Sequence, residues 1–316
     1  MHFDQDGTYN LVYTAEDECG NTTLAERVVE VFSLRTVLYP DGTFIINEKS
    51  SDQASNEALH GGTATNVYAP FDPNGATDVD KYIFANNTKR PWNSVRTSIK
   101  SVEVGSVIAP TSLACWFQYM SNCENIDLAN VNTSNVTDMS YLFHGCSTLT
   151  SLDVTHFDTS NVTNMRAMFG ACRALASLDV THFNTSNVTN MIDMFYGCQA
   201  LQNIEVGGFD TSKVTEMERM FSFCSALTSL DLSNFNTSNV TNMNAMFEGS
   251  SSLTTIYVSQ DFVVAQVTRS GSMFANMSTH LVGGAGTVWS SSNPLDKTYA
   301  HIDGGTSNPG YFTAKA

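Results

Sequence analysis

The sequence has few charged side chains and no long apolar run. Charged residues make up 15% of the 316 residues, and 31 acidic against 15 basic residues give a formal net charge of −16. This charge repels nucleic acid and anionic lipid, so we expect neither as a partner. No segment approaches the roughly 18 consecutive apolar residues of a membrane helix, and the first residues lack the pattern of a signal peptide. We therefore expect no membrane insertion within this chain, and any export signal to lie outside it.

The sequence also lacks the motifs of the common enzyme classes. No G-x-S-x-G, H-E-x-x-H, phosphate-binding P-loop or G-x-G-x-x-G pattern occurs in it. This absence does not exclude an enzyme, but it leaves no positive case for one. We therefore expect no catalytic residues, no metal and no cofactor.

A 26-residue repeat fills the centre of the chain. Each unit opens with methionine at position 0, and an apolar pair follows at positions 3 and 4. Cysteine or serine stands at position 7, and leucine or isoleucine stands at positions 10 and 13. The methionines are Met139, Met165, Met191, Met217 and Met243. This periodicity predicts a solenoid in which stacked repeats bury one continuous core.

Each unit carries two signals of secondary structure. Apolar residues at positions 0, 3, 4 and 7 predict a short helix, and the following L-x-x-L-D-[VL] run predicts a short strand. A polar stretch such as HFDTSNVTN at 156–164 closes the unit. We therefore predict an α/β repeat, a right-handed leucine-rich-repeat-like solenoid with one short helix and one short strand per coil.

Changes in this pattern divide the chain into four segments. Residues 1–34 alternate apolar and polar side chains around a Gly-Asn turn, which predicts a β-hairpin. Residues 35–105 hold short strand candidates between loops and predict a mixed α/β leader. The solenoid covers 106–280, and 281–316 form a turn-rich tail expected to fold over the last coil. A lone hairpin is marginally stable, so we expect 1–34 to pair with further strands of this or another chain.

The repeat resembles a known family. The unit M-x-x-M-F-x-x-C-x-x-L-x-x-L-D-L-x-x-F-[DN]-T-S-N-V-T is similar to the BspA-type leucine-rich repeat of bacterial surface proteins, and five consecutive units carry it. Residues 3–32 resemble the last strands of a bacterial immunoglobulin-like domain, of the kind found in surface and phage structural proteins. The BspA-type resemblance implies surface display and adhesion or partner binding, with no catalytic residues.

Two columns of chemically interesting side chains recur at the repeat period. Cysteines at position 7 predict a ladder with one thiol per coil. Because a metal site needs ligands that converge on one point, core packing of these thiols is favoured over disulfides or a metal. Acidic residues at position 14 predict a solvated or hydrogen-bonded face, with Ca²⁺ as the alternative. The cysteines are Cys146, Cys172, Cys198 and Cys224, and the acidic residues are Asp127, Asp153, Asp179, Glu205 and Asp231.

Two further polar features are less sustained along the repeat. The T-S-N triplets are expected to bond to backbone groups that the turns leave bare, and glycosylation at N-x-[ST] is the alternative. His156 and His182 occupy equivalent positions, which leaves weak metal binding or pH sensing open beside simple exposure.

Positions that the core does not dictate are candidates for recognition. Aromatic and arginine side chains dominate interface energies, and several stand on or near the predicted helices. The predicted binding face consists of Tyr141, Arg166, Arg173, Tyr196, Arg219, Phe223 and Glu248.

The sequence thus predicts a non-catalytic bacterial protein that is secreted or displayed on the cell surface. We expect it to bind or adhere to a protein or glycan on a host or neighbouring cell. Two alternatives stay open: a fibre or receptor-binding component of a phage particle, and the targeting module of a larger exported enzyme.

Overall fold

The computed structural model describes residues 7–16, 22–31, 34–49, 66–68, 94–105 and 108–315. Within these ranges, regular structure consists of short strands and 3-10 helices, with no α-helix. The strands are β1 (Gly7–Glu16), β2 (Thr22–Val31), β3 (Leu34–Leu38), β4 (Thr43–Lys49), β5 (Asn66–Tyr68), β6 (Ser101–Val104), β7 (Asn125–Ile126), β8 (Ser229–Leu232), β9 (Thr255–Val258) and β10 (Thr313–Ala314). The 3-10 helices are η2 (Arg96–Ser98), η3 (Lys297–Tyr299) and η4 (Gly305–Ser307).

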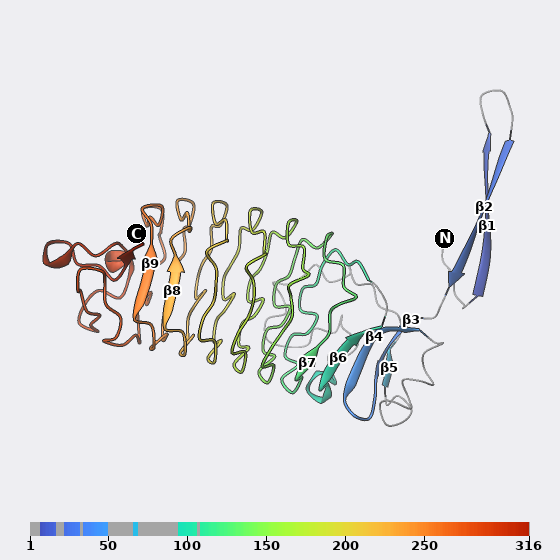
Figure 1. Ribbon diagram of the computed structural model, residues 1–316, viewed down its shortest axis with the longest axis horizontal. Coiled ribbons are helices and arrows are strands. Elements are labelled where there is room, and N and C mark those ends of the chain that lie inside the picture. The colour runs from blue at the N-terminus through green and yellow to red at the C-terminus, as the bar shows by residue number, and fades with distance from the viewer. Residues whose placement is uncertain are drawn as a thin grey trace.

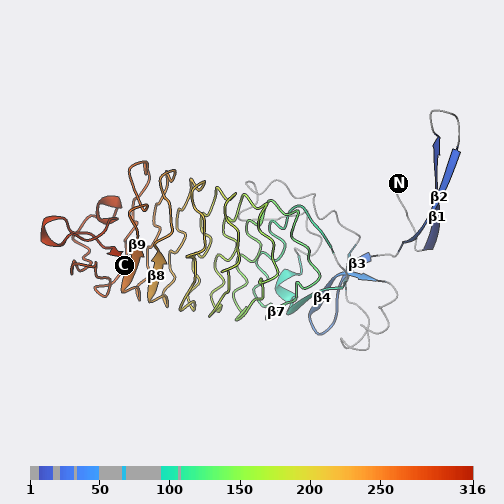
Figure 2. The same ribbon diagram turned by 45° about the horizontal axis from the view of Figure 1, so that its top comes forward.

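The repeats form a stack of coils. Figures 1 and 2 show the coils side by side in sequence order between β7 and β9. Parallel bridges link the residue before position 0 of each coil to its equivalent in the next, from Asp138 through Asn164 and Asn190 to Glu216 and Asn242. The predicted repeat solenoid is therefore confirmed. We number coils 1 to 7 by their first residues, Leu113, Met139, Met165, Met191, Met217, Met243 and Ser270.

The short helix predicted in each coil is wrong. At positions 2 and 6 the backbone is left-handed, for example at Tyr141 (φ 56°) and Gly145 (φ 77°) of coil 2, and an α-helix of L-residues cannot continue through such residues. Tandem turns replace it, in which Leu142 N–H donates to Met139 O at 3.3 Å. The N–H groups at positions 0, 2, 4 and 6 donate to the next coil instead, as Phe143 N does to Met168 O at 2.9 Å.

The predicted strands form only in part. The L-x-x-L-D-[VL] segments of coils 5 and 6 are β8 and β9, which pair in parallel register, and β7 is a two-residue equivalent in coil 1. The corresponding residues 151–154, 177–180 and 203–206 follow the same path without strand pairing. Regular structure in the coils is thus limited to short parallel strands.

Strands outside the repeats pair with both ends of the stack of coils. Strands β1 and β2 pair over ten residue pairs and with no other described strand. The leader sheet has the order β5-β3-β4-β6-β7, and β4, β6 and β7 are parallel neighbours that lead into coil 1. At the other end β10 pairs in parallel with β9, and Phe312 packs on Phe247, Phe262 and Phe274 with ring centroids 5.1 to 6.1 Å apart.

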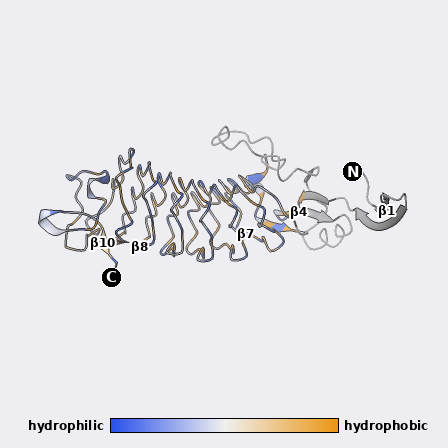
Figure 3. Cartoon of the chain, turned by 90° about the horizontal axis from the view of Figure 1, so that it is seen from above, coloured by the Kyte–Doolittle hydropathy of each residue, from blue (hydrophilic) through white to orange (hydrophobic). Residues whose placement is uncertain are grey.

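The core consists of columns of identical side chains. The phenylalanines at position 4 are fully buried, and neighbouring rings from Phe117 to Phe274 are stacked with centroids 5.6 to 6.3 Å apart. Hydrophobic and hydrophilic residues alternate along the coils throughout the stack (Figure 3). One hydrophobic cluster runs from Leu38 to Phe312, so neighbouring coils share their core.

The cysteines at position 7 belong to this core, as predicted. Each thiol donates to the carbonyl of the position-4 phenylalanine one coil earlier; Cys198 Sγ lies 3.2 Å from Phe169 O. Ser250 makes the same bond to Phe221 O at 2.6 Å, which explains why serine replaces cysteine in coil 6. Cys123, Cys146, Cys172, Cys198 and Cys224 are free and buried, and burial raises the pKa of Cys198 to about 12.

This bond predicts an order of stability among substitutions at Cys198. Cys198→Ala removes the sulfur atom and leaves Phe169 O without that donor, so we expect it to lower the free energy of unfolding by about 2 kcal/mol. Cys198→Ser keeps the donor, as Ser250 does, and is expected to cost about 1 kcal/mol or less. Urea unfolding measures both, and a larger loss for Cys198→Ser than for Cys198→Ala would contradict the role of the bond.

The T-S-N stretches hold the polar edge of the coils together, as predicted. Thr159 Oγ1 donates to Asn184 O at 3.0 Å and accepts from Asn184 N at 2.8 Å, and its side chain is buried. Asn161 Nδ2 donates back to Ser134 O at 2.8 Å. The triplets at 159–161, 185–187 and 237–239 therefore each bond to both neighbouring coils.

Candidate functional site

An open groove lies along the strand side of coils 1 to 4. Its volume is about 910 Å³, and it is lined by positions 12 to 17 of successive coils. Its polar lining includes Ser177 and Asn203 at position 12, both exposed, and part-buried Leu152 contributes an apolar surface. Because the exposed side chains at position 12 are short, they do not fill the groove.

The acidic column at position 14 runs through the groove. Asp153 Oδ1 accepts from Thr155 N at 2.9 Å and from Thr155 Oγ1 at 2.6 Å, and Asp179 is held by Thr181 in the same way. These hydrogen bonds lower the pKa of Asp153 and Asp179. The predicted hydrogen-bonded face is confirmed here, and it consists of ionised carboxylates in a fixed orientation.

The last acid of the column already has a basic partner. Lys315, which follows β10, donates its ammonium group to Asp231 Oδ2 in β8, and Lys315 N donates to Val258 O at 3.2 Å. The other four acids, Asp127, Asp153, Asp179 and Glu205, form no ion pair with any basic residue in the described part of the chain. Asp127, Asp153 and Asp179 therefore keep their charge available, whereas Glu205 also interacts electrostatically with Lys315.

The two stacked histidines connect neighbouring coils. His156 Nε2 lies 2.9 Å from Leu128 O, and His182 Nε2 lies 2.8 Å from Val154 O. A carbonyl oxygen only accepts, so Nε2 must carry the proton in both rings. The structure thus supports a structural role for the pair, with His156 at the edge of the groove.

Apart from Arg173, the residues predicted as a binding face lie on the tandem turns, a different part of the coil from the groove. We call the side chains at positions 1, 2, 5 and 6 the turn face. Tyr141 is 4% exposed and packs with Cys115 and Ala167, and Arg166 covers its ring at 5.7 Å. The prediction that Tyr141 faces outward is wrong, because the left-handed backbone at position 2 places it in a buried column.

The other predicted residues are engaged with one another or with neighbours. Arg219 bonds Asp193 at 2.7 and 3.0 Å and Glu218 at 2.9 Å, and the bonds to Asp193 are the main cause that raises its pKa. Phe223 is 38% exposed and meets Tyr196 edge to face at 6.0 Å.

The remaining two predicted residues, Glu248 and Arg173, differ in their surroundings. Glu248 accepts from Asn276 Nδ2 at 3.1 Å, and Arg173 is exposed at position 8, outside the turn face. The structure therefore brings Tyr141 together with Arg166, and Tyr196 with Phe223. Phe223 N also donates to Glu248 O at 2.7 Å. Whether these residues bind a partner stays a prediction.

Aromatic residues at position 6 of the turn face have a packing role. A Cβ atom added at Gly145 would lie 2.5 Å from the Tyr119 ring, and one at Gly249 would lie 2.5 Å from the Phe223 ring. Both glycines are left-handed. Each large ring thus lies across a glycine of the next coil. A large side chain at position 6 is therefore followed by glycine at position 6 of the next coil because the ring fills the space that a Cβ atom would need.

The groove is the feature that sequence reasoning missed. Its acidic column was recognised, but as a solvated face and not as part of a concave surface. The available signal was the recurrence of short polar residues at position 12 beside the acids, at Ser151, Ser177 and Asn203. The described residues contain no cluster of three or more potential metal-ligating side chains, and no helix among them is suited to spanning a bilayer.

A stack of near-identical coils around one shared core defines the protein as a repeat solenoid. Two overlapping stretches, residues 111–205 and 174–283, match the family described as Mycoplasma protein of unknown function, DUF285. These stretches cover more than half of the chain, and the protein belongs to this family, a bacterial repeat family related to leucine-rich-repeat-like surface proteins. No curated protein and no solved structure matches the chain. The immunoglobulin-like resemblance of residues 3–32 stays a prediction.

Proposed function

We propose that the protein is a non-catalytic binding protein of the bacterial surface or exterior, which recognises a partner molecule through the groove of coils 1 to 4. The observation that carries the proposal is the groove itself, about 910 Å³ in volume, whose lining includes a row of exposed polar side chains that the core does not require. Solenoids recognise partners through such extended surfaces, and ligand sites are usually concave.

The chemistry of the lining supports binding more than catalysis. A catalytic acid or base needs a pKa that sets it apart from its neighbours. In the groove, Asp153 and Asp179 have the same hydrogen bonds from Thr155 and Thr181, and the pKa of both shifts in the same direction. A row of equivalent carboxylates suits repeated contacts along one partner.

The groove is also favoured over the turn face. On the turn face, the charge of Arg219 is satisfied by Asp193 and Glu218, and Tyr141 is buried. Contacts that are already made must be broken before a partner can use these groups. The exposed residues of the groove carry no comparable cost.

The proposal predicts that filling the groove abolishes binding. The full chain should be screened against extracellular matrix proteins and a glycan array, and each ligand found should be tested against Ser177→Trp. Ser177 lines the groove and is exposed, so an indole there should reduce affinity by about tenfold or more.

Two further variants give this experiment its controls. Ser238→Trp places the same ring at an exposed serine of a T-S-N triplet and should leave affinity unchanged. Tyr196→Ala with Phe223→Ala tests the turn face. If this double variant loses affinity while Ser177→Trp keeps it, the partner binds on the turn face and the groove assignment is wrong.

A further inference from the structure

We propose that the partner of the groove is an extended protein segment bearing lysine or arginine at alternate positions. This inference rests on the proposed function and names the class of its ligand. The groove is acidic, because its lining contains Asp127, Asp153, Asp179 and Glu205 and no lysine or arginine. A groove lined by one sign of charge concentrates ligands of the opposite sign.

The protein itself contains an example of this recognition. Lys315 stands at the end of an extended segment, two residues after Thr313, which is in register with Tyr257 of β9 and through it with Asp231 of β8. Its ammonium group reaches the carboxylate of Asp231, the fifth acid of the same column. The tail therefore shows that a lysine ammonium group can reach a carboxylate of this column from a strand that runs beside the coils. The four remaining acids stand at the same position of their coils.

The hydrogen bonds of Asp153 and Asp179 leave one carboxylate oxygen of each in position to accept from a cation. Because Oδ1 of Asp153 and Asp179 already accepts the bonds from Thr155 and Thr181, each carboxylate is held in one orientation. No described residue donates to Oδ2 of either acid. The free oxygen can accept from an ammonium or guanidinium group without breaking a bond in the protein.

The spacing of the column fits an extended chain. Parallel strand-like coils lie about 4.8 Å apart, so four successive acids span roughly 14 Å. An extended segment of about five residues spans roughly 13 Å, and its alternate side chains point to one face. Three basic side chains at alternate positions therefore cover the length of the column, and their flexible stems absorb the difference in repeat.

The lining also argues against a ligand that needs stacking. Apart from the His156 imidazole, no aromatic ring lines the groove. The groove offers carboxylates, hydroxyls and amides beside an apolar surface to which Leu152 and Leu178 contribute. Such a lining can contact both the charged ends and the aliphatic stems of basic side chains.

A labelled peptide and a matched pair of variants test this inference. The probe is a fluorescein-labelled Lys-Thr-Lys-Thr-Lys peptide with neutral flanks, and a Glu-Thr-Glu-Thr-Glu peptide is the reference. Binding of both to the full chain is measured by fluorescence anisotropy. We expect the lysine peptide to bind more weakly as salt increases, since exposed charges are screened, and the glutamate peptide not to bind.

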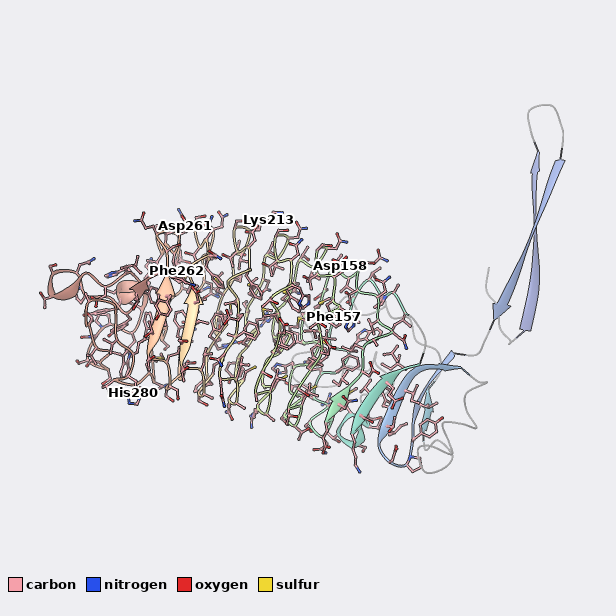
Figure 4. The ribbon with its side chains drawn as sticks, viewed as in Figure 1. Phe157, Asp158, Lys213, Asp261, Phe262 and His280 are labelled. Carbon is pink, nitrogen blue, oxygen red and sulfur yellow. The ribbon has the colours of Figure 1, made fainter. Side chains whose placement is uncertain are left out.

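The test variant is Asp153→Asn with Asp179→Asn, which removes two charges and keeps the oxygen that bonds the turn. Its control is Asp158→Asn with Asp210→Asn. These exposed acids are bonded by Ser160 N and Ser212 N at 3.0 and 2.9 Å, lie outside the groove lining, and have a pKa lowered by the same kind of bond. Asp158 stands at the polar edge of the stack, with Lys213 and Asp261 (Figure 4).

We expect the groove variant to lose about fivefold in affinity for the lysine peptide, because two exposed ion pairs disappear, and the control to keep its affinity. The inference would be overturned if both variants lost affinity for the lysine peptide equally, or if the groove variant bound this peptide as tightly as the unchanged protein does. The result with a ligand found in the screen separates the two proposals. If Ser177→Trp abolishes its binding and the groove variant does not, the groove binds a partner but not through basic side chains.

Discussion

Phe195→Ala is expected to lower the free energy of unfolding by about 4 kcal/mol, the largest effect of any single substitution proposed here. Phe195 is fully buried at position 4 of coil 4. Its ring stacks between Phe169, at 5.8 Å and 5°, and Phe221, at 5.6 Å and 12°. Removing it leaves a cavity inside the shared core and ends both ring contacts, each of which adds stability beyond burial.

The position of Phe195 within the stack enlarges this effect. The stability of a solenoid is approximately the sum of the coils and of the interfaces between neighbours, so one central cavity weakens the interfaces on both sides. Phe223→Ala in coil 5 is the matched control, because its ring is 38% exposed and removing it leaves no closed cavity. We expect this control to cost about 1 kcal/mol or less. Urea unfolding of the full chain measures both, and comparable losses would show that the phenylalanine column does not hold the coils together.

The columns of the core could be predicted because each coil repeats them. A residue type that recurs every 26 positions at Met165, Phe169 and Cys172 needs the same environment in every coil, and stacking is the arrangement that provides it. The thiol bond to the preceding coil follows from the same register, although the sequence only indicated that the cysteines were buried.

The path of the chain between these columns could not be predicted in the same way. Apolar residues at positions 0, 3, 4 and 7 face one side both in a helix and in tandem turns, so the pattern does not distinguish the two. The decisive feature is the left-handed backbone at position 2, where Tyr141, Ala167, Asp193 and Arg219 stand. These side chains share no tendency toward that conformation. It is held by the hydrogen bonds that their backbone N–H groups donate to carbonyls of the next coil.

The site was harder to predict for a related reason. Arginine and aromatic residues on one face of a predicted helix suggest an interface, but on the turn face Tyr141 is buried and Arg219 is paired with Asp193. The groove depends on how successive coils are placed relative to each other, which no single repeat encodes. Its acids at Asp153 and Asp179 were visible in the sequence, but the concave surface that they line was not.

Asp303→Asn is expected to lower the free energy of unfolding by about 3 kcal/mol, because one carboxylate connects three turns of the tail. Its Oδ2 accepts from Ala285 N and Thr287 N, both at 2.9 Å. Its Oδ1 accepts from Thr287 Oγ1 at 2.7 Å, Gly305 N at 2.9 Å and Gly310 N at 3.3 Å. An amide in place of Oδ2 would direct its own donors toward backbone N–H groups that have no other partner.

Asp296→Asn is the matched control in the same tail. Asp296 accepts one bond, from Thr298 N at 2.9 Å, at the start of η3. Asparagine serves this position as well as aspartate, so this substitution is expected to change stability by only about 0.5 kcal/mol. Urea unfolding and limited proteolysis should both separate the two variants, since loosening of the tail uncovers the edge of β9, where β10 pairs. Equal stability of the two variants at neutral pH would contradict the role assigned to Asp303.

The contribution of Asp303 should also depend on pH in a defined direction. Burial acts to raise its pKa, but the hydrogen bonds from Thr287, Gly305 and Gly310 outweigh burial and lower the pKa to about 2. The unfolded chain titrates near the ordinary value of about 4, so the ionised group stabilises the fold fully above that pH. The stability difference between the natural chain and Asp303→Asn should therefore be constant from about pH 7 to 5 and shrink as the pH falls from about 4 through 2. A difference that grows over this acid range would mean that the donors around Asp303 bind its protonated form.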